Sequence, residues 1–308
     1  MITDSFTNTV YFSSLLQEKC PILNTHITKA LQERKIPYFY LAGTKDIWCR
    51  DFMPLQIEKD KFVFYKYTPD YLQDKIGLTL QTDPILVFQL ESNELLRLLP
   101  MSMKEEVRFD GLRPIPISRP MFHRIEMDLV VDGGNVVKCG DKIVMTDKVF
   151  VENEDKTHAE VQRKLEEEFQ CEVVFIPWDE KGEPYGHGDG IIHYLGDNRV
   201  LMTNYDDFDK GFACEYLRIL ENHFEVTTLK YNVKRKHERS WSYINFLQIG
   251  NLVLVPQLGI PEDEQALEQI SVAMPDCDVV GIPALEAVRR GGALNCISWN
   301  IKTRNHGR

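Results

Sequence analysis

The sequence lacks several features that would assign it to common protein classes. It has no run of about 18 apolar residues, the length that a membrane-spanning helix needs, and residues 1–10 lack the basic and apolar segments of a signal peptide. It also lacks an excess of basic charge, because the formal net charge is -11 and the pI is near 5.3. This balance argues against nucleic acid as a partner and favours a cationic ligand. We therefore expect a cytoplasmic protein that binds neither membranes nor nucleic acid.

The seven cysteines are odd in number and never form a C-x-x-C pair. This pattern argues against a disulfide scaffold or a zinc ribbon and indicates a reducing compartment. The glycine pair Gly133-Gly134 is not accompanied by the G-x-G-x-x-G or G-K-[ST] motifs of phosphate-binding loops. We therefore expect neither a cofactor nor a metal.

A hairpin–helix–strand unit recurs along the second half of the chain. Its predicted strands and helices are 129–138, 142–146, 157–169 and 171–176, then 191–195, 199–203, 208–221 and 224–229, then 243–249, 252–255, 261–274 and 277–282. The turn glycines Gly140, Gly196 and Gly250 are 56 and 54 residues apart. A fixed period of this size is typical of a radial or stacked repeat, which predicts one α/β domain of ββαβ units over residues 1–308.

The flanking segments extend this pattern at both ends. The first 35 residues have helical spacing of apolar residues, residues 38–67 form a strand and a hairpin that make an earlier unit, and the strand after Cys296 makes a last one. Residues 69–120 contain six prolines and are predicted as a surface insertion with a helix near residues 92–99.

Unusual polar residues cluster at the predicted first strand of each hairpin and keep step with the repeat. The clusters are Trp48–Asp51, Asp132–Asn135, Gly186–Gly190, Ser242–Asn245 and Asn295–Cys296. Equivalent positions of a radial repeat converge on its axis. We therefore expect a central pocket formed by Asp51, Asp132, His187, Asp189, Asn245 and Cys296.

The carboxylates in this set suit a guanidinium ligand. A guanidinium is a planar cation with five N–H donors, which carboxylates match in bidentate geometry. Asp51 and Asp189 are therefore candidates to hold it from two sides, and Trp48 is a candidate to stack on its face.

The cysteine and histidine suit covalent chemistry on that ligand. Cys296 follows a glycine pair that gives its backbone room to turn, and a thiolate is the nucleophile suited to the central guanidinium carbon. His187 is suited to protonate departing ammonia and then to activate water. Asp132 is suited to hold the imidazole in one tautomer and to favour its charged form.

These motifs together resemble one known family. In order they are Trp48–Pro54 (WCRDFMP), Asp132–Asn135 (DGGN), Gly186–Asp189 (GHGD), Ser242–Phe246 (SYINF) and Gly291–Cys296 (GGALNC). The chain resembles the agmatine deiminase and Porphyromonas-type peptidylarginine deiminase family, guanidino-modifying enzymes of the pentein fold, a five-bladed α/β propeller. The resemblance covers essentially the whole chain. It implies a hydrolase acting on a small cationic guanidinium substrate.

The resemblance also implies roles for individual residues. Cys296 becomes the nucleophile, His187 the acid–base, and Asp51 and Asp189 the guanidinium ligands. Further substrate contacts are expected at positions within the same motifs, namely Trp48, Arg50, Asn135, Asn245 and Gly292.

Three departures from the family pattern leave the substrate open. Met53 stands where the family usually has glycine, Asp132 where it has glutamate, and Asn295 where agmatine deiminases commonly have histidine. Agmatine is the first expected substrate and peptidyl or free arginine the alternative. An amidinotransferase and a non-catalytic guanidinium-binding protein are the other functions left open. The oligomeric state, monomer or homodimer, is open as well.

Competing interpretations exist for some of these residues. His187, Asp189 and His193 offer imidazoles and a carboxylate to a metal, although the glycines among them disfavour one shared strand face. Cys49 competes with Cys296 as nucleophile, but strand alternation would point it away from the side of Trp48. Trp241 is expected to be a core aromatic.

Overall fold

The computed structural model describes residues 1–72, 82, 109–110, 113–114, 123–234 and 236–303. The predicted helix near residues 92–99 and most of the predicted insertion at 69–120 lie outside these residues.

Five three-stranded sheets form the body of the described chain. In each sheet the first two strands are antiparallel and the third runs parallel to the second. The sheets are β3 (Leu55–Glu58), β4 (Lys61–Lys66) and β7 (His123–Val130); β8 (Val137–Cys139), β9 (Lys142–Thr146) and β10 (Glu172–Ile176); β11 (Ile192–Gly196), β12 (Arg199–Met202) and β13 (Glu225–Thr228); β14 (Leu247–Ile249), β15 (Leu252–Gln257) and β16 (Asp278–Pro283); and β17 (Ser298–Ile301), β1 (Thr9–Ser13) and β2 (Tyr38–Leu41). The predicted ββαβ repeat is confirmed.

Helices occupy the connections between the second and third strands. They are α1 (Leu16–Lys19), α2 (Pro21–Glu33), α6 (Lys148–Glu152), α7 (His158–Phe169), α8 (Lys210–Leu220) and α9 (Glu262–Ala273). Local sequence explains where some of them begin. Thr157 and Glu160 form a capping box at the start of α7, and the Asp209 side chain accepts from two backbone amides at the start of α8. The connection from β4 to β7 contains the short antiparallel pair β5 (Phe109–Asp110) and β6 (Arg113–Pro114).

The last sheet joins the two ends of the chain, which corrects two predictions. Residues 9–13 are the strand β1 and not helix, and β2 pairs with β1 rather than with the following hairpin. All five residues of β1 are buried, because the strand lies between β17 and β2. A fully buried apolar run carries no alternation, so its spacing alone cannot distinguish strand from helix. Similarly, the predicted strand 129–138 is the end of β7, a turn, and then β8.

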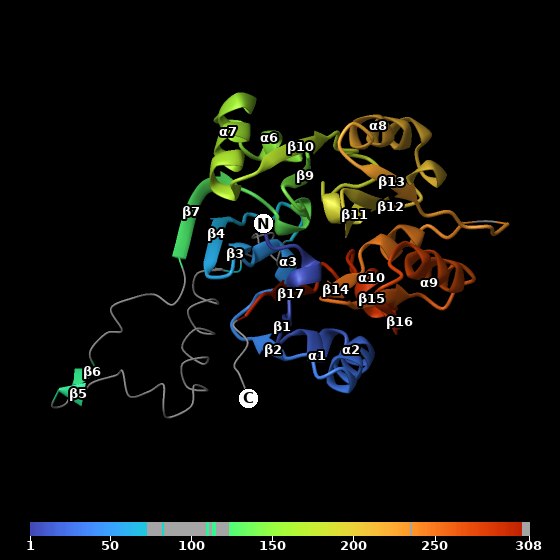
Figure 1. Ribbon diagram of the computed structural model, residues 1–308, viewed down its shortest axis with the longest axis horizontal. Coiled ribbons are helices and arrows are strands. Elements are labelled where there is room, and N and C mark those ends of the chain that lie inside the picture. Colours follow the sequence, from blue (N-terminus) through green and yellow to red (C-terminus); the bar gives the residue numbers. More distant parts are fainter. Residues whose placement is uncertain (73–81, 83–108, 111–112, 115–122, 235, 304–308) are drawn as a thin grey trace.

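The sheets surround the centre of the molecule, with α7, α8, α9 and α2 toward its outside (Figure 1). Short helical turns precede the first strands: α3 (Cys49–Phe52), η2 (Gly133–Asn135), η3 (Gly188–Gly190) and η5 (Ser240–Ile244), with η1 (Asp4–Phe6), η4 (Tyr205–Asp207) and α10 (Leu285–Val288) elsewhere. In space α3 contacts η2, η2 contacts η3, η3 contacts η5, and β17 contacts α3. The polar motifs therefore lie in these turns, and not in strands as the sequence analysis expected.

Candidate active site

A cavity of about 80 Å³ lies where these turns meet. Its lining consists of Trp48, Asp51, Tyr71, Leu72, Tyr185, His187, Arg290, Gly291, Gly292 and Cys296. Five predicted site residues are among them: Trp48, Asp51, His187, Gly292 and Cys296. The fold thus brings positions from both ends and the middle of the chain to one cavity.

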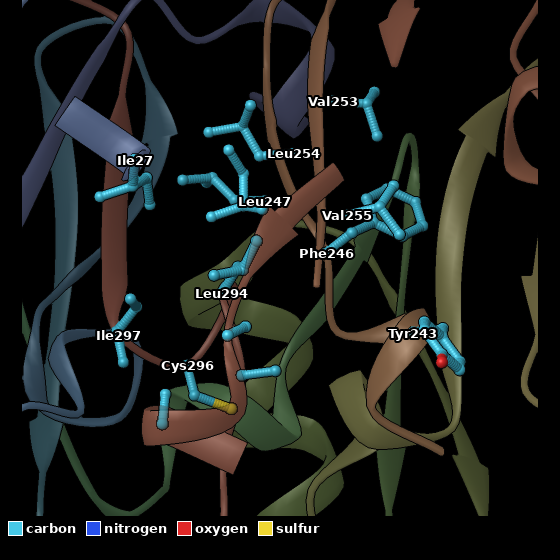
Figure 2. Packing of buried hydrophobic residues seen from close by; sticks show 14 of the residues in the cluster. Ile27, Tyr243, Phe246, Leu247, Val253, Leu254, Val255, Leu294, Cys296 and Ile297 are labelled. Atoms are coloured by element: carbon cyan, nitrogen blue, oxygen red, sulfur yellow. The ribbon is translucent and has the colours of Figure 1, made fainter. Parts of the chain in front are cut away.

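Cys296 sits in the turn before β17, with its sulfur on the cavity and its neighbours in the core. Leu294 and Ile297 are fully buried in the same hydrophobic cluster (Figure 2). The Cys296 amide donates to Oδ1 of Asn245 at 3.2 Å, and the Cys296 carbonyl accepts from the amide of Arg50 at 3.1 Å. These contacts hold the backbone on both sides, which fixes the direction of the sulfur.

The thiol of Cys296 lies in a negative environment. Its Sγ donates toward Oδ2 of Asp189 at 3.6 Å. Burial first, and then the charges of Asp189 and Asp51, raise the pKa of the Cys296 thiol well above its usual range. With these neighbours the thiol is protonated at neutral pH. A cation between the two carboxylates would reverse their effect and favour the thiolate.

His187 lies between two carboxylates. Its Nε2 is 3.2 Å from Oδ2 of Asp132, and its Nδ1 is 3.8 Å from Oδ1 of Asp51. Burial alone lowers the pKa of the imidazole, but the charge of Asp51 and the hydrogen bond to Asp132 raise it to about 10. His187 is therefore an imidazolium at neutral pH, the state that a proton donor to a leaving amine needs. The aspartate at position 132 reaches the histidine despite being shorter than the family's glutamate.

Asp51 faces the same cavity from α3 and is 2% exposed. Its Oδ1 accepts from the amide of Gly134 at 3.0 Å, and its Oδ2 accepts from the hydroxyl of Tyr71 at 3.2 Å. Burial raises the pKa of Asp51 to about 8, with His187 opposing the rise and the neighbouring carboxylates adding to it. A cationic ligand beside Asp51 would stabilise its charged form and lower its pKa again.

Two glycines of the motifs are required by close approach. A Cβ at Gly134 would come within 2.6 Å of His187 Nδ1 and 2.7 Å of Asp51 Oδ1. A Cβ at Gly292 would come within 2.4 Å of the Trp48 ring. Any larger residue at either position would displace a group that lines the cavity.

Asp189 is held by a chain of side chains behind the cysteine. Its Oδ2 accepts from Nδ2 of Asn295 at 2.7 Å, and Oδ1 of Asn295 accepts from Nη2 of Arg50 at 2.8 Å. The same Arg50 nitrogen donates to Oδ1 of Asn300 at 2.7 Å. The cavity lining includes neither Arg50 nor Asp189. The guanidinium of Arg50 supports Asn295, and the carboxylate of Asp189 lies 3.6 Å from the Cys296 sulfur, so substrate contacts by these two residues stay predictions.

The two asparagines predicted as substrate contacts, Asn135 and Asn245, are not part of the cavity lining and support the site from behind. Asn135 pairs with the backbone of Thr146, accepting from its amide at 2.7 Å and donating to its carbonyl at 3.3 Å. Asn245 donates to the carbonyl of Asp189 at 3.3 Å in addition to holding Cys296. Both side chains are committed to scaffold hydrogen bonds, which explains why they are buried polar groups.

The aromatic part of the cavity wall was not predicted from the sequence. Tyr71 and Tyr185 line the cavity beside Leu72, and the Tyr71 ring lies 5.1 Å from the ring of Tyr185 and 5.7 Å from that of His187, measured between centroids. Tyr185 directly precedes the glycine–histidine motif, and this position next to a site motif could have identified it as a candidate. Tyr71 lies at the start of the segment predicted as a surface insertion, so the sequence around it did not indicate a role in the site.

The competing interpretations gain no support from the geometry. Among the described residues, no group of three or more His, Cys, Asp or Glu side chains is arranged to hold a metal. His193 packs against Phe246 at a centroid distance of 3.9 Å and is absent from the lining of the cavity. Cys49 is fully buried in α3, and burial raises its thiol pKa well above the usual range. The sequence argument against Cys49 assumed a strand and was wrong, although the cavity does exclude it. Trp241 packs half-buried against the core, as expected.

In the part of the chain that the structure describes, no helix has the length and apolar character needed to cross a bilayer.

Comparison with protein families finds a match over nearly the whole chain. Residues 16–301 match the family described as Porphyromonas-type peptidyl-arginine deiminase. A Lactococcus lactis protein assigned as an agmatine deiminase is 24% identical over 207 residues, which are 56% of this chain and 57% of that protein. A Streptococcus mutans protein of the same assignment is 25% identical over 209 residues, 56% of each chain. The matched region thus spans little more than half the length of these curated relatives.

Solved structures show the same fold over nearly the whole chain. The agmatine deiminase of Enterococcus faecalis superposes with a TM-score of 0.70 at 17% identity, covering 98% of this chain and 95% of that one. The agmatine deiminase of C. jejuni gives 0.69 at 17% identity, with 98% and 96% covered. The dimethylarginine dimethylaminohydrolase of Pseudomonas aeruginosa is more distant, at 0.55 and 12%, with 96% and 100% covered. The predicted fold, a five-bladed α/β propeller of the pentein type, is confirmed.

Proposed function

The chain belongs to the Porphyromonas-type peptidyl-arginine deiminase family, and we propose from this premise that it hydrolyses the guanidinium group of a small cationic substrate. The overall reaction adds water to the central carbon, releases ammonia as ammonium and leaves a ureido product. The observation that carries the proposal is that Cys296, His187 and Asp51 face one cavity, with Asp132 behind the imidazole.

Binding prepares the nucleophile in this mechanism. Asp51 holds the guanidinium inside the cavity, with Trp48 against the cavity wall. Asp189 is not part of the cavity lining, and its carboxylate acts on the cation from beside the Cys296 sulfur, 3.6 Å away. The two carboxylates that raise the pKa of the thiol are then neutralised by the cation, so the thiolate of Cys296 becomes accessible when substrate is present. Cys296 therefore becomes a reactive thiolate only when a cation occupies the cavity.

Two displacement steps follow. The thiolate attacks the central carbon, and the imidazolium of His187 gives its proton to the departing amine, which leaves a thiouronium on Cys296. His187, now neutral, accepts a proton from water as the water attacks the same carbon. The C–S bond then breaks, which returns the thiol and releases the ureido product.

Agmatine is the substrate that we assign first. Several relatives and solved structures of this fold carry the name agmatine deiminase, and a small amine-tailed guanidine suits an acidic protein with an aromatic-walled cavity. Free or peptidyl arginine is the alternative within the same family.

The test is direct. The protein is incubated with agmatine, with arginine and with an arginine-containing peptide, and ureido product and ammonia are measured for each. We expect product from agmatine, and none from any substrate with Cys296→Ala. Turnover by Cys296→Ala at the wild-type rate, or no product from any of the three with wild-type protein, would refute the proposal.

A further inference from the structure

Lys148 is a buried cation beside the acid–base pair that none of the sequence motifs includes. It is the first residue of α6, and its side chain is 3% exposed. Its stem packs so closely that a Cβ at Gly186 would come within 2.3 Å of its Cδ. Lys148 is absent from the cavity lining, so any role in the reaction passes through its neighbours.

The ammonium group is surrounded by acceptors. Nζ donates to the carbonyl of Tyr185 at 2.9 Å and lies 3.1 Å from Oε1 of Glu152, 3.4 Å from Oδ1 of Asp70 and 4.0 Å from Oδ2 of Asp132. A buried lysine keeps its charge only when carboxylates surround it in this way. Lys148 is therefore an ammonium in the same cluster as the carboxylate that holds His187.

Aromatic rings complete the surroundings of the ammonium. Nζ lies 5.6 Å from the ring centroids of both Tyr71 and Trp178. Tyr71 also lines the cavity, and its hydroxyl donates a hydrogen bond to Asp51. Lys148 therefore lies next to a residue of the cavity wall as well as next to Asp132, the partner of His187.

The charges around His187 are mostly negative. Asp51 faces its Nδ1, Asp132 faces its Nε2, and Oε2 of Glu183 accepts from its backbone amide at 2.8 Å. Glu152 adds a further carboxylate next to Asp132: burial, and then the charge of Asp132, raise its pKa to about 7, with Lys148 opposing. An imidazolium facing this many carboxylates would hold its proton too tightly to act as an acid.

We infer that Lys148 is a positioning residue of the proposed reaction, whose ammonium between Asp132 and Glu152 offsets negative charge around His187 and leaves the imidazolium able to release its proton. This inference rests on the proposed function only for its effect on turnover. The charge balance itself is a property of the folded chain and is measured without substrate.

Two charge variants of opposite sign test it. Lys148→Met keeps the apolar stem of the side chain and removes its positive charge. Glu152→Gln keeps the shape of the glutamate side chain and removes the negative charge that pairs with Lys148. The imidazole of His187 is titrated by NMR in the full chain, with its resonance assigned by comparison with His187→Gln. We expect its titration to move up by about one pH unit in Lys148→Met and down in Glu152→Gln, and to return toward wild type in the double variant. With a substrate that turns over, Lys148→Met should lower kcat about tenfold with little change in KM.

Lys138 offers a matched control. It is also a buried lysine, paired with Asp4 at 2.6 Å. Lys138→Met should lower thermal stability while leaving the His187 titration unchanged. If Lys148→Met shifts the titration no more than Lys138→Met does, Lys148 serves packing alone and the inference is wrong.

The remaining outcomes separate the two proposals. If Lys148→Met fails to fold, Glu152→Gln decides, because an unmoved His187 titration in that variant overturns the charge balance. If the titrations move in opposite directions but the wild-type protein converts none of the guanidines, the charge balance stands and the proposed function fails.

Discussion

Asp51→Asn is the substitution that tests the active-site assignment most sharply. The variant keeps the shape of the side chain and an oxygen that can accept the hydrogen bond from the amide of Gly134, which now donates to Oδ1 of Asp51 at 3.0 Å. It removes the negative charge that lies 3.8 Å from Nδ1 of His187 and that we assign to the substrate cation. The change is therefore electrostatic rather than steric.

The size of the effect follows from burial. Asp51 is 2% exposed, so the cation in the variant would lose a charged partner where water cannot replace it. Breaking one partner of a buried ion pair costs about 2–5 kcal/mol, which corresponds to a fall in kcat/KM of about 30-fold to about 5,000-fold. Asp263→Asn is the matched control, because Asp263 is likewise buried and accepts from Tyr243 and from backbone amides away from the cavity. It should lower thermal stability and leave kcat/KM near wild type.

The pH profile supplies a second readout of the same variant. In wild type, activity falls as pH drops through the raised pKa of Asp51, about 8, because the protonated acid no longer binds a cation. Activity also falls as pH rises through the pKa of His187, about 10, because the imidazolium is lost. Asp51→Asn should abolish the first limb and move the second to lower pH, since the charge of Asp51 helps to raise the pKa of His187. Unchanged kcat/KM with both limbs in place would refute the assignment.

Three further outcomes are expected. A haloacetamidine should label Cys296 in preference to the other six cysteines, as measured by peptide mass mapping; labelling at Cys49 would overturn the choice of nucleophile. Gly134→Ala should lower kcat by at least about tenfold while the protein stays folded, because the new Cβ would displace His187; wild-type kcat would show that the site relaxes freely. The kcat/KM for agmatine should exceed that for arginine by at least about tenfold, or about 1.4 kcal/mol, and a reversed ratio that Arg290→Ala removes would instead indicate a site for a carboxylate tail.

The repeat could be predicted from the sequence because each unit carries its own local signals. The glycines at 140, 196 and 250 lie at the turns that join the two strands of each hairpin, and these strands pair as expected. The helices α7, α8 and α9 follow in the predicted places. The sheet that joins β17 to β1 could not be predicted in this way. Its strands are separated by almost the entire chain, and its central strand is buried on both faces, so neither spacing nor alternation marks the pairing.

The residues that line the cavity were predictable where the motif itself makes contact. Cys296, His187 and Asp51 follow from the chemistry of a guanidinium ligand, and the structure places all three on the cavity. Tyr71 could not be found because an isolated tyrosine after a hairpin has no distinguishing pattern. Nothing in the sequence marks Lys148 either, since a lysine at the start of a helix is normally exposed, and residues distant in sequence, such as Gly186 and Trp178, pack around it and bury it.

Two of the three departures from the family pattern, at Met53 and Asn295, have separate physical explanations. Met53 has φ -81° and ψ 147°, an extended conformation that any residue adopts, and its side chain fills a buried apolar cluster, so glycine is not required there. Asn295 has a more specific role, because one amide satisfies two partners of opposite charge. Its oxygen accepts from Arg50 while its nitrogen donates to Asp189, which lies against the thiol. A neutral histidine also has one donor and one acceptor nitrogen, so a ring at this position would have to fix a single tautomer to serve the same two partners. The asparagine therefore preserves the orientation of Asp189 by other means, and the departure is compatible with the chemistry that Cys296 is proposed to perform.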